Sequence, residues 1–193
     1  NAFRRRRIIH SLVFVAMTDF GPDLPEVLTA YPAIDLPQTL PIVLKNFRQL
    51  YIAESEKYAH VTYFFNGGYA DPVGGEQRLQ VPSPDVKYYD RTPAMSSKVI
   101  IHLVLQAIQQ HQFDFIVLNL ANTDMVAHTG NLQAGITTME FTDGYLQKLE
   151  EAVLAVGGTL IVTGDHGNIE EMKNLSTDEV DTEHSGNPVP FWL

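Results

Sequence analysis

Hydrophobic residues in the second half of the chain form short continuous runs, separated by longer stretches with helical spacing. Phe115 to Leu120 is an almost unbroken apolar run, which is typical of a strand buried on both faces of a sheet. Thr159 to Thr163 predicts a second buried strand, and Val189 to Leu193 predicts a last short one. Leu132 to Val153 carries apolar residues at helical spacing, which predicts a long helix between the two main strands.

The same alternation continues towards the start of the chain. Leu40 to Leu50 predicts a short amphipathic helix, and Ser96 is placed to cap a helix that carries Val99 to Ile108. Tyr51 to Ala53 and Val61 to Phe65 are rich in β-branched and aromatic residues and are predicted as strands. Because helices and strands alternate, we predict an α/β fold with a mostly parallel sheet and helices on both faces.

Two segments interrupt this pattern. Asn66 to Pro84 is rich in glycine and proline and is predicted to be a long surface excursion. Gly21 to Pro41 contains five prolines and no helical period, which indicates a linker or domain boundary after a predicted strand at Ile8 to Met17. We therefore predict two domains, one comprising residues 1–36 with the proline-rich linker and the other comprising residues 37–193.

Ionisable side chains gather where the predicted strands end. Asp124 and His128 follow the first buried strand and are four residues apart, so a helical turn there would point them in one direction. Asp165 and His166 follow the second strand between glycines that allow a sharp turn, and His184 precedes the last strand. Any one of these histidines alone is explained as a core or surface residue. All five together, at the strand ends where α/β sheets bind ligands, predict a metal site.

The ligand types suggest which metals would bind. Carboxylate and imidazole ligands suit Mn²⁺, Zn²⁺ or Fe²⁺, and without cysteine the oxygen-rich site favours the harder ions. Asp124, His128 and His184 would hold one ion, whereas Asp165 and His166 supply only two ligands for another. This hypothesis requires His184 to lie within about 10 Å of Asp124 and His128.

Composition narrows the class of protein. The chain has 193 residues, of which 45% are hydrophobic and 19% charged, as in globular proteins. Its formal net charge of −10 argues against nonspecific binding to nucleic acid or to anionic membranes, but bound metals allow an anionic substrate. Cysteine is absent, which excludes disulfides and thiolate chemistry. The apolar runs are shorter than the roughly 18 residues of a membrane span, and the start of the chain lacks the pattern of a signal peptide.

Two groups of basic residues have alternative interpretations. The four arginines from Arg4 to Arg7 form either a solvated charged turn or an anion clamp, because arginine forks match phosphate and carboxylate groups. Lys57 follows a predicted strand beside two glutamates. It is either an ordinary surface cation or part of the site.

Four segments resemble one known family. They are IAESEKYAHVTYFFNGG (Ile52 to Gly68), ANTDMVAHTG (Ala121 to Gly130), TGDHGNIEEM (Thr163 to Met172) and EHSGNPVPF (Glu183 to Phe191). With these segments the chain resembles the cofactor-independent phosphoglycerate mutases from about Leu40 onward. The resemblance implies an alkaline-phosphatase-like fold. It also implies a glycolytic and gluconeogenic isomerase that interconverts 3-phosphoglycerate and 2-phosphoglycerate through a phosphoserine, using two Mn²⁺ ions.

The resemblance further implies roles for single residues. It assigns one metal to Asp124, His128 and His184, and the second metal to Asp165 and His166. Mg²⁺, Zn²⁺ or Co²⁺ are possible substitutes for manganese. Lys57 would contact the transferring phosphoryl group.

The family also binds substrate from its neighbouring domain through a Phe-Arg-x-x-Arg motif. Phe3, Arg4 and Arg7 match its spacing, although Arg5 and Arg6 stand where the family has Pro-Asp. No segment corresponds to the family's nucleophilic serine or to a further aspartate of the second metal site. We therefore expect residues 1–36 to be the end of a transferase domain and residues 37–193 to be a phosphatase-like domain that lacks its N-terminal part. The isolated chain is then expected to bind one Mn²⁺ well and a second poorly, without mutase activity.

Two other functions remain open at this point. One is another two-metal phosphatase, phosphopentomutase or phosphodiesterase of the same superfamily, and the other is a noncatalytic metal-binding remnant. For the isomerase we expect a small phosphoglycerate substrate, no nucleic-acid or membrane partner, a monomer at full length and a cytoplasmic location.

Overall fold

The structure is a computed structural model that describes residues 11–18, 27–32, 34, 36–174 and 176–193. It divides the chain into two compact units, Asn1–Pro37 and Gln38–Leu193. In the first unit two short strands, β1 (Val15–Ala16) and β2 (Leu28–Thr29), pair in parallel. Of the strand predicted from Ile8 to Met17, only β1 is a strand among the described residues.

A three-stranded parallel sheet forms the centre of the second unit. Strand β3 (Gln49–Glu54) lies between β4 (Gln77–Val81) and β5 (Phe115–Leu118), in the order β4-β3-β5. All six residues of β3 are buried, as expected for a central strand. Two further strands, β6 (Val162–Thr163) and β7 (Phe191–Trp192), pair with each other in antiparallel orientation. The predicted mostly parallel sheet is therefore confirmed, with an antiparallel pair at the end of the chain.

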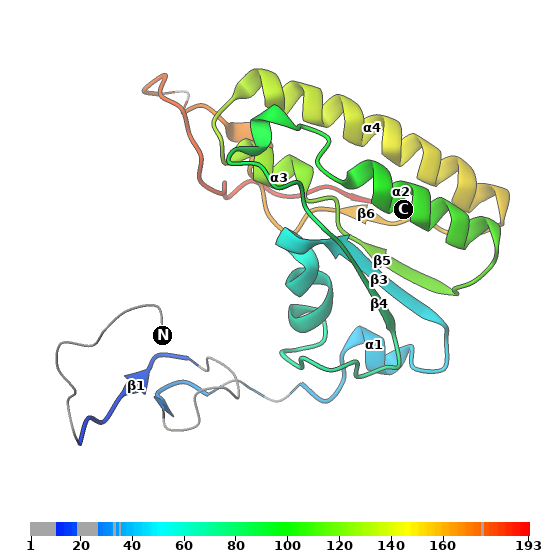
Figure 1. Cartoon of the computed structure of the whole chain (residues 1–193), viewed down its shortest axis with the longest axis horizontal. Coiled ribbons are helices and arrows are strands. Elements are labelled where there is room, and N and C mark those ends of the chain that lie inside the picture. The colour runs from blue at the N-terminus through cyan, green and yellow to red at the C-terminus, as the bar shows by residue number, and fades with distance from the viewer. Residues whose placement is uncertain (1–10, 19–26, 33, 35, 175) are drawn as a thin grey trace. The chain divides into compact units, whose positions relative to one another are not determined.

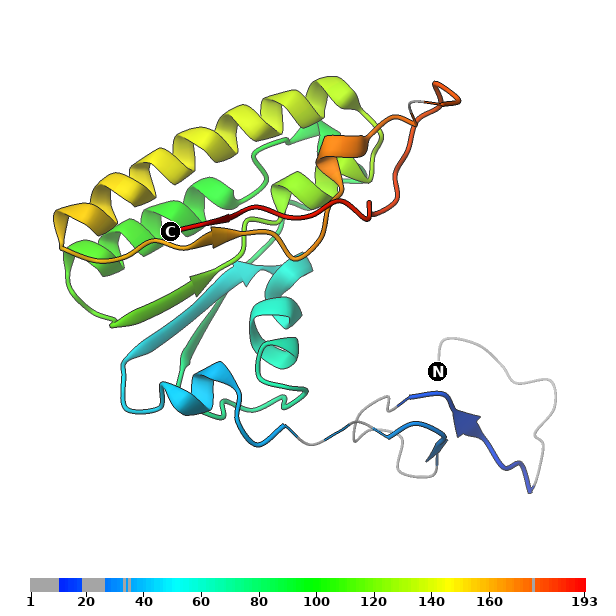
Figure 2. The same cartoon turned by 180° about the vertical axis from the view of Figure 1, so that it is seen from behind.

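The two faces of the sheet are covered by different elements. Leu50 and Ile52 on β3 pack into one cluster with residues of α2 (Ser97–Gln109) and α4 (Leu132–Ala155). Figures 1 and 2 show these two helices side by side over the same face. Tyr51 and Ala53 point to the opposite face, as alternation along a strand requires, and pack with Val61. The predicted α/β class with helical segments on both faces is confirmed.

The two long helices follow from local sequence. In α2, Ile100, Ile101, Val104 and Ala107 are buried at helical spacing. Helix α4 begins after Asn131, whose side chain accepts a hydrogen bond from the Ala134 amide at 3.2 Å, as an N-cap does. Its last turn is followed by Gly157 in the left-handed conformation (φ 70°).

The two strands predicted to be buried are less buried than expected: β5 is half-buried at every position, and only Val162–Thr163 of the segment Thr159 to Thr163 is a strand, with Thr163 exposed. Four other local predictions were wrong. Val61 to Phe65 is not a strand but largely a π-helical turn, His60–Phe64, that continues from the 3₁₀ turn Ser55–Lys57. In this segment tertiary packing outweighs strand propensity: Val61 and Thr62 are buried, and the other side of the turn is exposed. The predicted excursion from Asn66 to Pro84 contains the edge strand β4, whose polar residues concealed it. Only Leu40–Val43 (α1) of the predicted helix from Leu40 to Leu50 is helical.

The fourth wrong prediction concerns a helix cap. The side chain of Ser96 does not cap α2 but donates to the Pro82 carbonyl at 2.8 Å. Its backbone amide donates to Glu54 Oε1 at 2.9 Å, which joins the start of α2 to the end of β3.

Candidate metal centre

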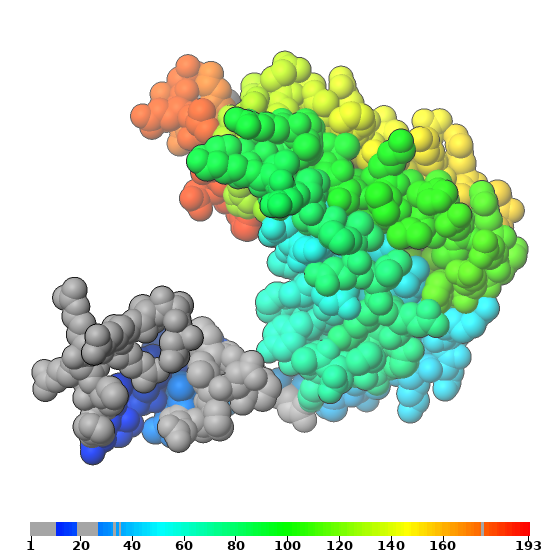
Figure 3. All heavy atoms as spheres, viewed as in Figure 1, coloured from blue at the N-terminus to red at the C-terminus, as the bar shows by residue number. Residues whose placement is uncertain are grey.

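The predicted site residues follow the carboxyl ends of three strands. Lys57 closes the turn after β3, and Asp124 lies in the short helix α3 (Asn122–Ala127) that follows β5. His128 ends that helix, one turn after Asp124. The loop after β6 leads to η4 (Ile169–Glu171). Figure 3 shows the orange-red loop that follows η4 at the same end of the second unit as the yellow-green start of α4. The predicted helical turn between Asp124 and His128 is therefore present.

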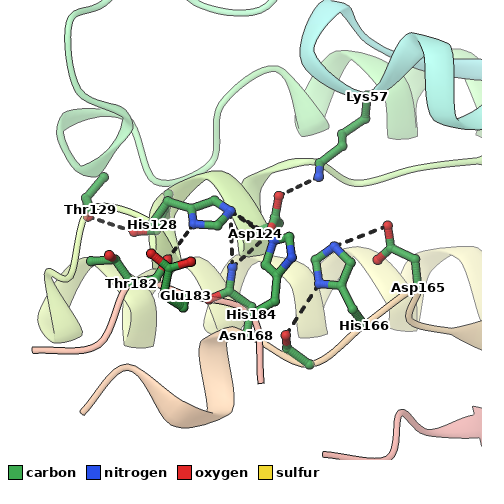
Figure 4. A network of polar contacts seen from close by, with 12 residues as sticks. Lys57, Asp124, His128, Thr129, Asp165, His166, Asn168, Thr182, Glu183 and His184 are labelled. Atoms are coloured by element: carbon green, nitrogen blue, oxygen red, sulfur yellow. Dashed lines mark hydrogen bonds and ion pairs between the residues drawn. The ribbon is translucent and has the colours of Figure 1, made fainter. Parts of the chain in front are cut away.

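Three ligand atoms form a small triangle at the centre of the site (Figure 4). His128 Nε2 lies 3.1 Å and His184 Nε2 3.3 Å from Asp124 Oδ1. The two Nε2 atoms are 3.1 Å from each other. His184 thus meets the distance that the sequence-based hypothesis required of it, although 56 residues separate it from His128.

The size of this triangle is suited to a metal ion. Ligands about 2.0–2.1 Å from a tetrahedral ion lie about 3.3–3.4 Å from one another, and ligands of an octahedral ion of similar bond length lie about 3 Å apart. The observed edges of 3.1, 3.1 and 3.3 Å fall between these values. The spacing of Asp124, His128 and His184 is therefore compatible with one shared divalent ion.

A backbone carbonyl selects the tautomer of His128. Its Nδ1 lies 2.7 Å from the Thr182 carbonyl oxygen, which can only accept a hydrogen bond. Nδ1 therefore carries the proton and donates it to Thr182. In the neutral ring this leaves the lone pair of Nε2 directed at Asp124 and His184, the arrangement found in metal-binding histidines.

Asp124 is held ionised by its neighbours. Its side chain is only 13% exposed, and burial by itself would raise the pKa of its carboxyl group. The buried Lys57 Nζ pairs with Oδ2, and Asn168 Nδ2 donates to Oδ1 at 2.7 Å. Together with the charge of Lys57, these hydrogen bonds lower the pKa of Asp124 to about 2. A carboxylate in this state is a ready ligand for a cation.

The other two predicted ligands lie beside this triangle. The His166 ring stacks on the His184 ring, with centroids 3.7 Å apart at 24°, and His166 Nε2 lies 3.5 Å from Asp165 Oδ2. Ligand atoms of Asp124, His166 and His184 all lie within 4.8 Å of one another. The five residues thus form one continuous cluster, with the half-exposed Asp165 at its edge.

Arg4 and Arg7 lie outside the described residues, so their position relative to this cluster is not part of the structure. Sequence analysis missed Asn168, which is buried and contacts Asp124 and lies 3.5 Å from His128 Nε2. An uncharged side chain has no charge pattern to reveal it. Its only sequence cue is its place in the polar segment after β6.

Two cavities are present near the ends of the sheet. One of about 510 Å³ adjoins the metal-ligand cluster through His128 and is also lined by Lys87, Tyr88 and Asp90. The other, of about 750 Å³, lies at the start of β3 around Arg48 and Gln49, far along the strand from Lys57. Of these two cavities, the smaller is lined by a residue of the cluster and the larger is not.

Comparison with known proteins places these observations in a family context. The sequence model of the Metalloenzyme superfamily matches residues 28–193. The chain is 46% identical over its whole length to a 2,3-bisphosphoglycerate-independent phosphoglycerate mutase of Thermomicrobium roseum, and 44% identical over 99% of its length to one of Chloroflexus aggregans. It spans only 37% and 36% of the lengths of these two relatives.

A solved structure is similar as well. Crystal structures of Leishmania mexicana phosphoglycerate mutase at low cobalt concentration include a chain that matches 92% of this chain with a TM-score of 0.83 and 31% identity. The match covers 35% of that chain.

In the described part of the present chain, no helix combines the length and apolar character needed to cross a membrane.

Proposed function

The chain belongs to the Metalloenzyme superfamily, and from this we propose that the protein interconverts 3-phosphoglycerate and 2-phosphoglycerate through a phosphoserine. The observation that carries the proposal is the convergence of Asp124, His128 and His184 on one ion-sized triangle, with Lys57 buried against it. The relatives of 44–46% identity are named for this isomerisation. Because the chain spans about a third of their length, the activity and substrate are proposals for the whole protein.

The proposal includes two divalent metal ions bound at the site, and the ion proposed is Mn²⁺. Asp124, His128 and His184 would hold one ion, and Asp165 and His166 would contribute to the other. When bound, such ions supply positive charge that activates a hydroxyl nucleophile and offsets the charge of a phosphoryl group. Asp124 and the imidazoles contribute preformed ligand positions, and the Thr182 carbonyl keeps His128 in the ligating tautomer.

Lys57 is proposed to act on the phosphoryl group. The residue is 7% exposed and its ammonium group pairs with Asp124, so this group is already positioned and partly desolvated. A cation fixed in this way stabilises charge on transferring phosphoryl oxygens more effectively than one in water.

The remaining roles belong to the same proposal. We assign Arg4 and Arg7 to the binding of substrate. We assign the nucleophilic role to no serine of this chain. The proposed domain assignment follows, with the end of a transferase domain and its linker in residues 1–36 and a phosphatase-like domain in residues 37–193. Soluble small-molecule chemistry of this kind agrees with a cytoplasmic location, which remains part of the proposal.

A chimera tests this function. In the Thermomicrobium roseum mutase, the matched 194-residue segment would be replaced by the present chain. We expect the chimera to form 2-phosphoglycerate from 3-phosphoglycerate in a metal-dependent way, and Lys57→Met and Asp124→Ala to abolish turnover. Lys98→Met serves as the matched control, because this exposed lysine lies on α2.

The outcomes separate the alternatives. Release of inorganic phosphate as the main product would favour a phosphatase of the same superfamily. A folded chimera that binds Mn²⁺ but turns over no phosphoglycerate would favour a noncatalytic metal-binding remnant. Equal Mn²⁺ binding by the unmodified chain and its Asp124→Ala variant, measured by calorimetry, would remove the ligand assignment itself.

A further inference from the structure

Glu170 lies outside the metal-ligand cluster but contacts two of the segments that build it. Its Oε2 accepts a hydrogen bond from the Asn168 amide at 2.8 Å. Its Oε1 accepts from the Ser185 hydroxyl and from Asn187 Nδ2, the latter at 3.1 Å. Asn168 belongs to the segment of Asp165 and His166, whereas Ser185 directly follows His184. One carboxylate therefore joins the segments that carry three of the candidate ligands.

The connection continues to the centre of the site. The side chain of Asn168, whose amide Glu170 holds, donates to Asp124 Oδ1 at 2.7 Å. The two segments also meet directly, because the Ser185 amide donates to the Gly167 carbonyl at 2.9 Å. A Cβ atom at Gly167 would lie 2.2 Å from Ser185 Oγ and 2.4 Å from Glu170 Oε1, so a larger residue there would displace these two side-chain ends from each other. The stacking of His166 on His184 is the result of bringing these segments together.

We propose that Glu170 is a positioning residue that sets the distance between the His166 and His184 segments and thereby the geometry of the metal site. This proposal rests on the metal-binding part of the proposed function. It gives the carboxylate a task that a glutamine could perform only if at least one hydrogen-bond partner reoriented. Glu170 accepts hydrogen bonds with both oxygens, whereas a glutamine would turn an NH₂ group towards either the Asn168 amide or the Ser185 and Asn187 donors.

Outer hydrogen-bond partners of this kind typically change metal affinity by about 10–100-fold when they are mutated. We therefore expect Glu170→Gln to weaken Co²⁺ binding to the 193-residue chain by about 10–100-fold. The neighbouring Glu171 provides a matched control, because its Oε2 accepts only from Asn187 Nδ2, at 3.0 Å, among the described residues. Glu171→Gln retains an acceptor there and is expected to leave Co²⁺ affinity within about twofold.

The experiment is a Co²⁺ titration of the unmodified chain, Glu170→Gln and Glu171→Gln, followed by the visible absorption of the bound ion. The position and intensity of these bands report the number and arrangement of ligands. A loss of stability alone would lower the melting temperature without changing the spectrum of the bound ion. We expect a changed spectrum for Glu170→Gln only. The same affinity and spectrum in all three proteins would overturn the positioning role.

Other outcomes are equally informative. Failure of the unmodified chain to bind Co²⁺ would contradict the proposed metal site, which is a different failure from a silent Glu170→Gln. If Glu170→Gln loses its helical circular dichroism, the Ser185→Ala variant takes its place. Ser185→Ala keeps the carboxylate and removes one of its donors, and we expect about tenfold weaker Co²⁺ binding. Unchanged affinity in that variant would also overturn the positioning role.

Discussion

Replacing Glu54 by glutamine is expected to remove a pH-dependent loss of stability. Glu54 ends the central strand β3 and is 0% exposed. Its Oε1 accepts from the Ser96 amide at 2.9 Å, but Oε2 has no hydrogen-bond partner among the described residues. Burial therefore raises the pKa of this carboxyl from its ordinary value of 4.5, and this effect outweighs the hydrogen bond from Ser96.

The sign of the effect follows from proton linkage. Between pH 4.5 and the raised pKa of the folded state, the native protein holds a proton that the unfolded chain has lost. The free energy of unfolding therefore falls as the pH rises through this range. An unsatisfied buried oxygen costs about 1–3 kcal/mol, which sets the expected size of the loss. Glutamine leaves an unpaired group as well, but its cost does not depend on pH.

Urea unfolding of both proteins at pH 4 and pH 8 measures this difference. We expect the free energy of unfolding of Glu54→Gln, relative to the unmodified chain, to increase by about 1–3 kcal/mol from pH 4 to pH 8. All other titrating groups are shared by the two proteins, so their contributions cancel. Parallel stability curves across this range would refute the reasoning, because they would show that Glu54 is ionised in the fold at no cost.

Three further tests, with five substitutions in all, concern the packing that supports the site. Tyr51→Phe should lower the free energy of unfolding by about 1–3 kcal/mol in urea, because it leaves the buried Gln49 Oε1 without the hydroxyl that donates to it at 2.8 Å; an unchanged midpoint would contradict this. Leu149→Ala on α4 should cost about 2–5 kcal/mol in the same measurement, whereas Leu154→Ala, at a position 61% exposed, should stay within about 0.5 kcal/mol, and equal losses would count against the assigned core. Gly144→Ala should raise the free energy of unfolding by about 0.5–1 kcal/mol, because a Cβ there meets no atom within 4 Å. Gly167→Ala should weaken Co²⁺ binding by separating the His166 and His184 segments. A lower melting temperature for Gly144→Ala, or unchanged Co²⁺ affinity for Gly167→Ala, would be inconsistent with the structure.

Local sequence patterns were sufficient to locate the long helices and the strands β3 and β5. In a chain of alternating helices and strands, the helical spacing of apolar residues in α4 indicates a helix, and the short continuous apolar run of β5 indicates a strand. The short elements were less predictable. Val61 to Phe65 has strand composition but turns as a π-helix, because it continues the turn after β3 and buries only one side. Edge strand β4 is polar on most positions and gave no hydrophobic pattern to find.

The candidate ligands of the proposed metal site could be named from the sequence. The sequence alone predicted a metal cluster from three features: Asp124 and His128 one helical turn apart, Asp165 and His166 between glycines, and His184 before the last strand. Tertiary structure alone decided how these groups meet, because distances between segments depend on packing and backbone hydrogen bonds that span tens of residues. It directs the Thr182 carbonyl to His128, brings Lys57 to Asp124, and lets Glu170 join two loops. Residue types therefore fixed which atoms can bind, and the fold fixed how far apart those atoms lie.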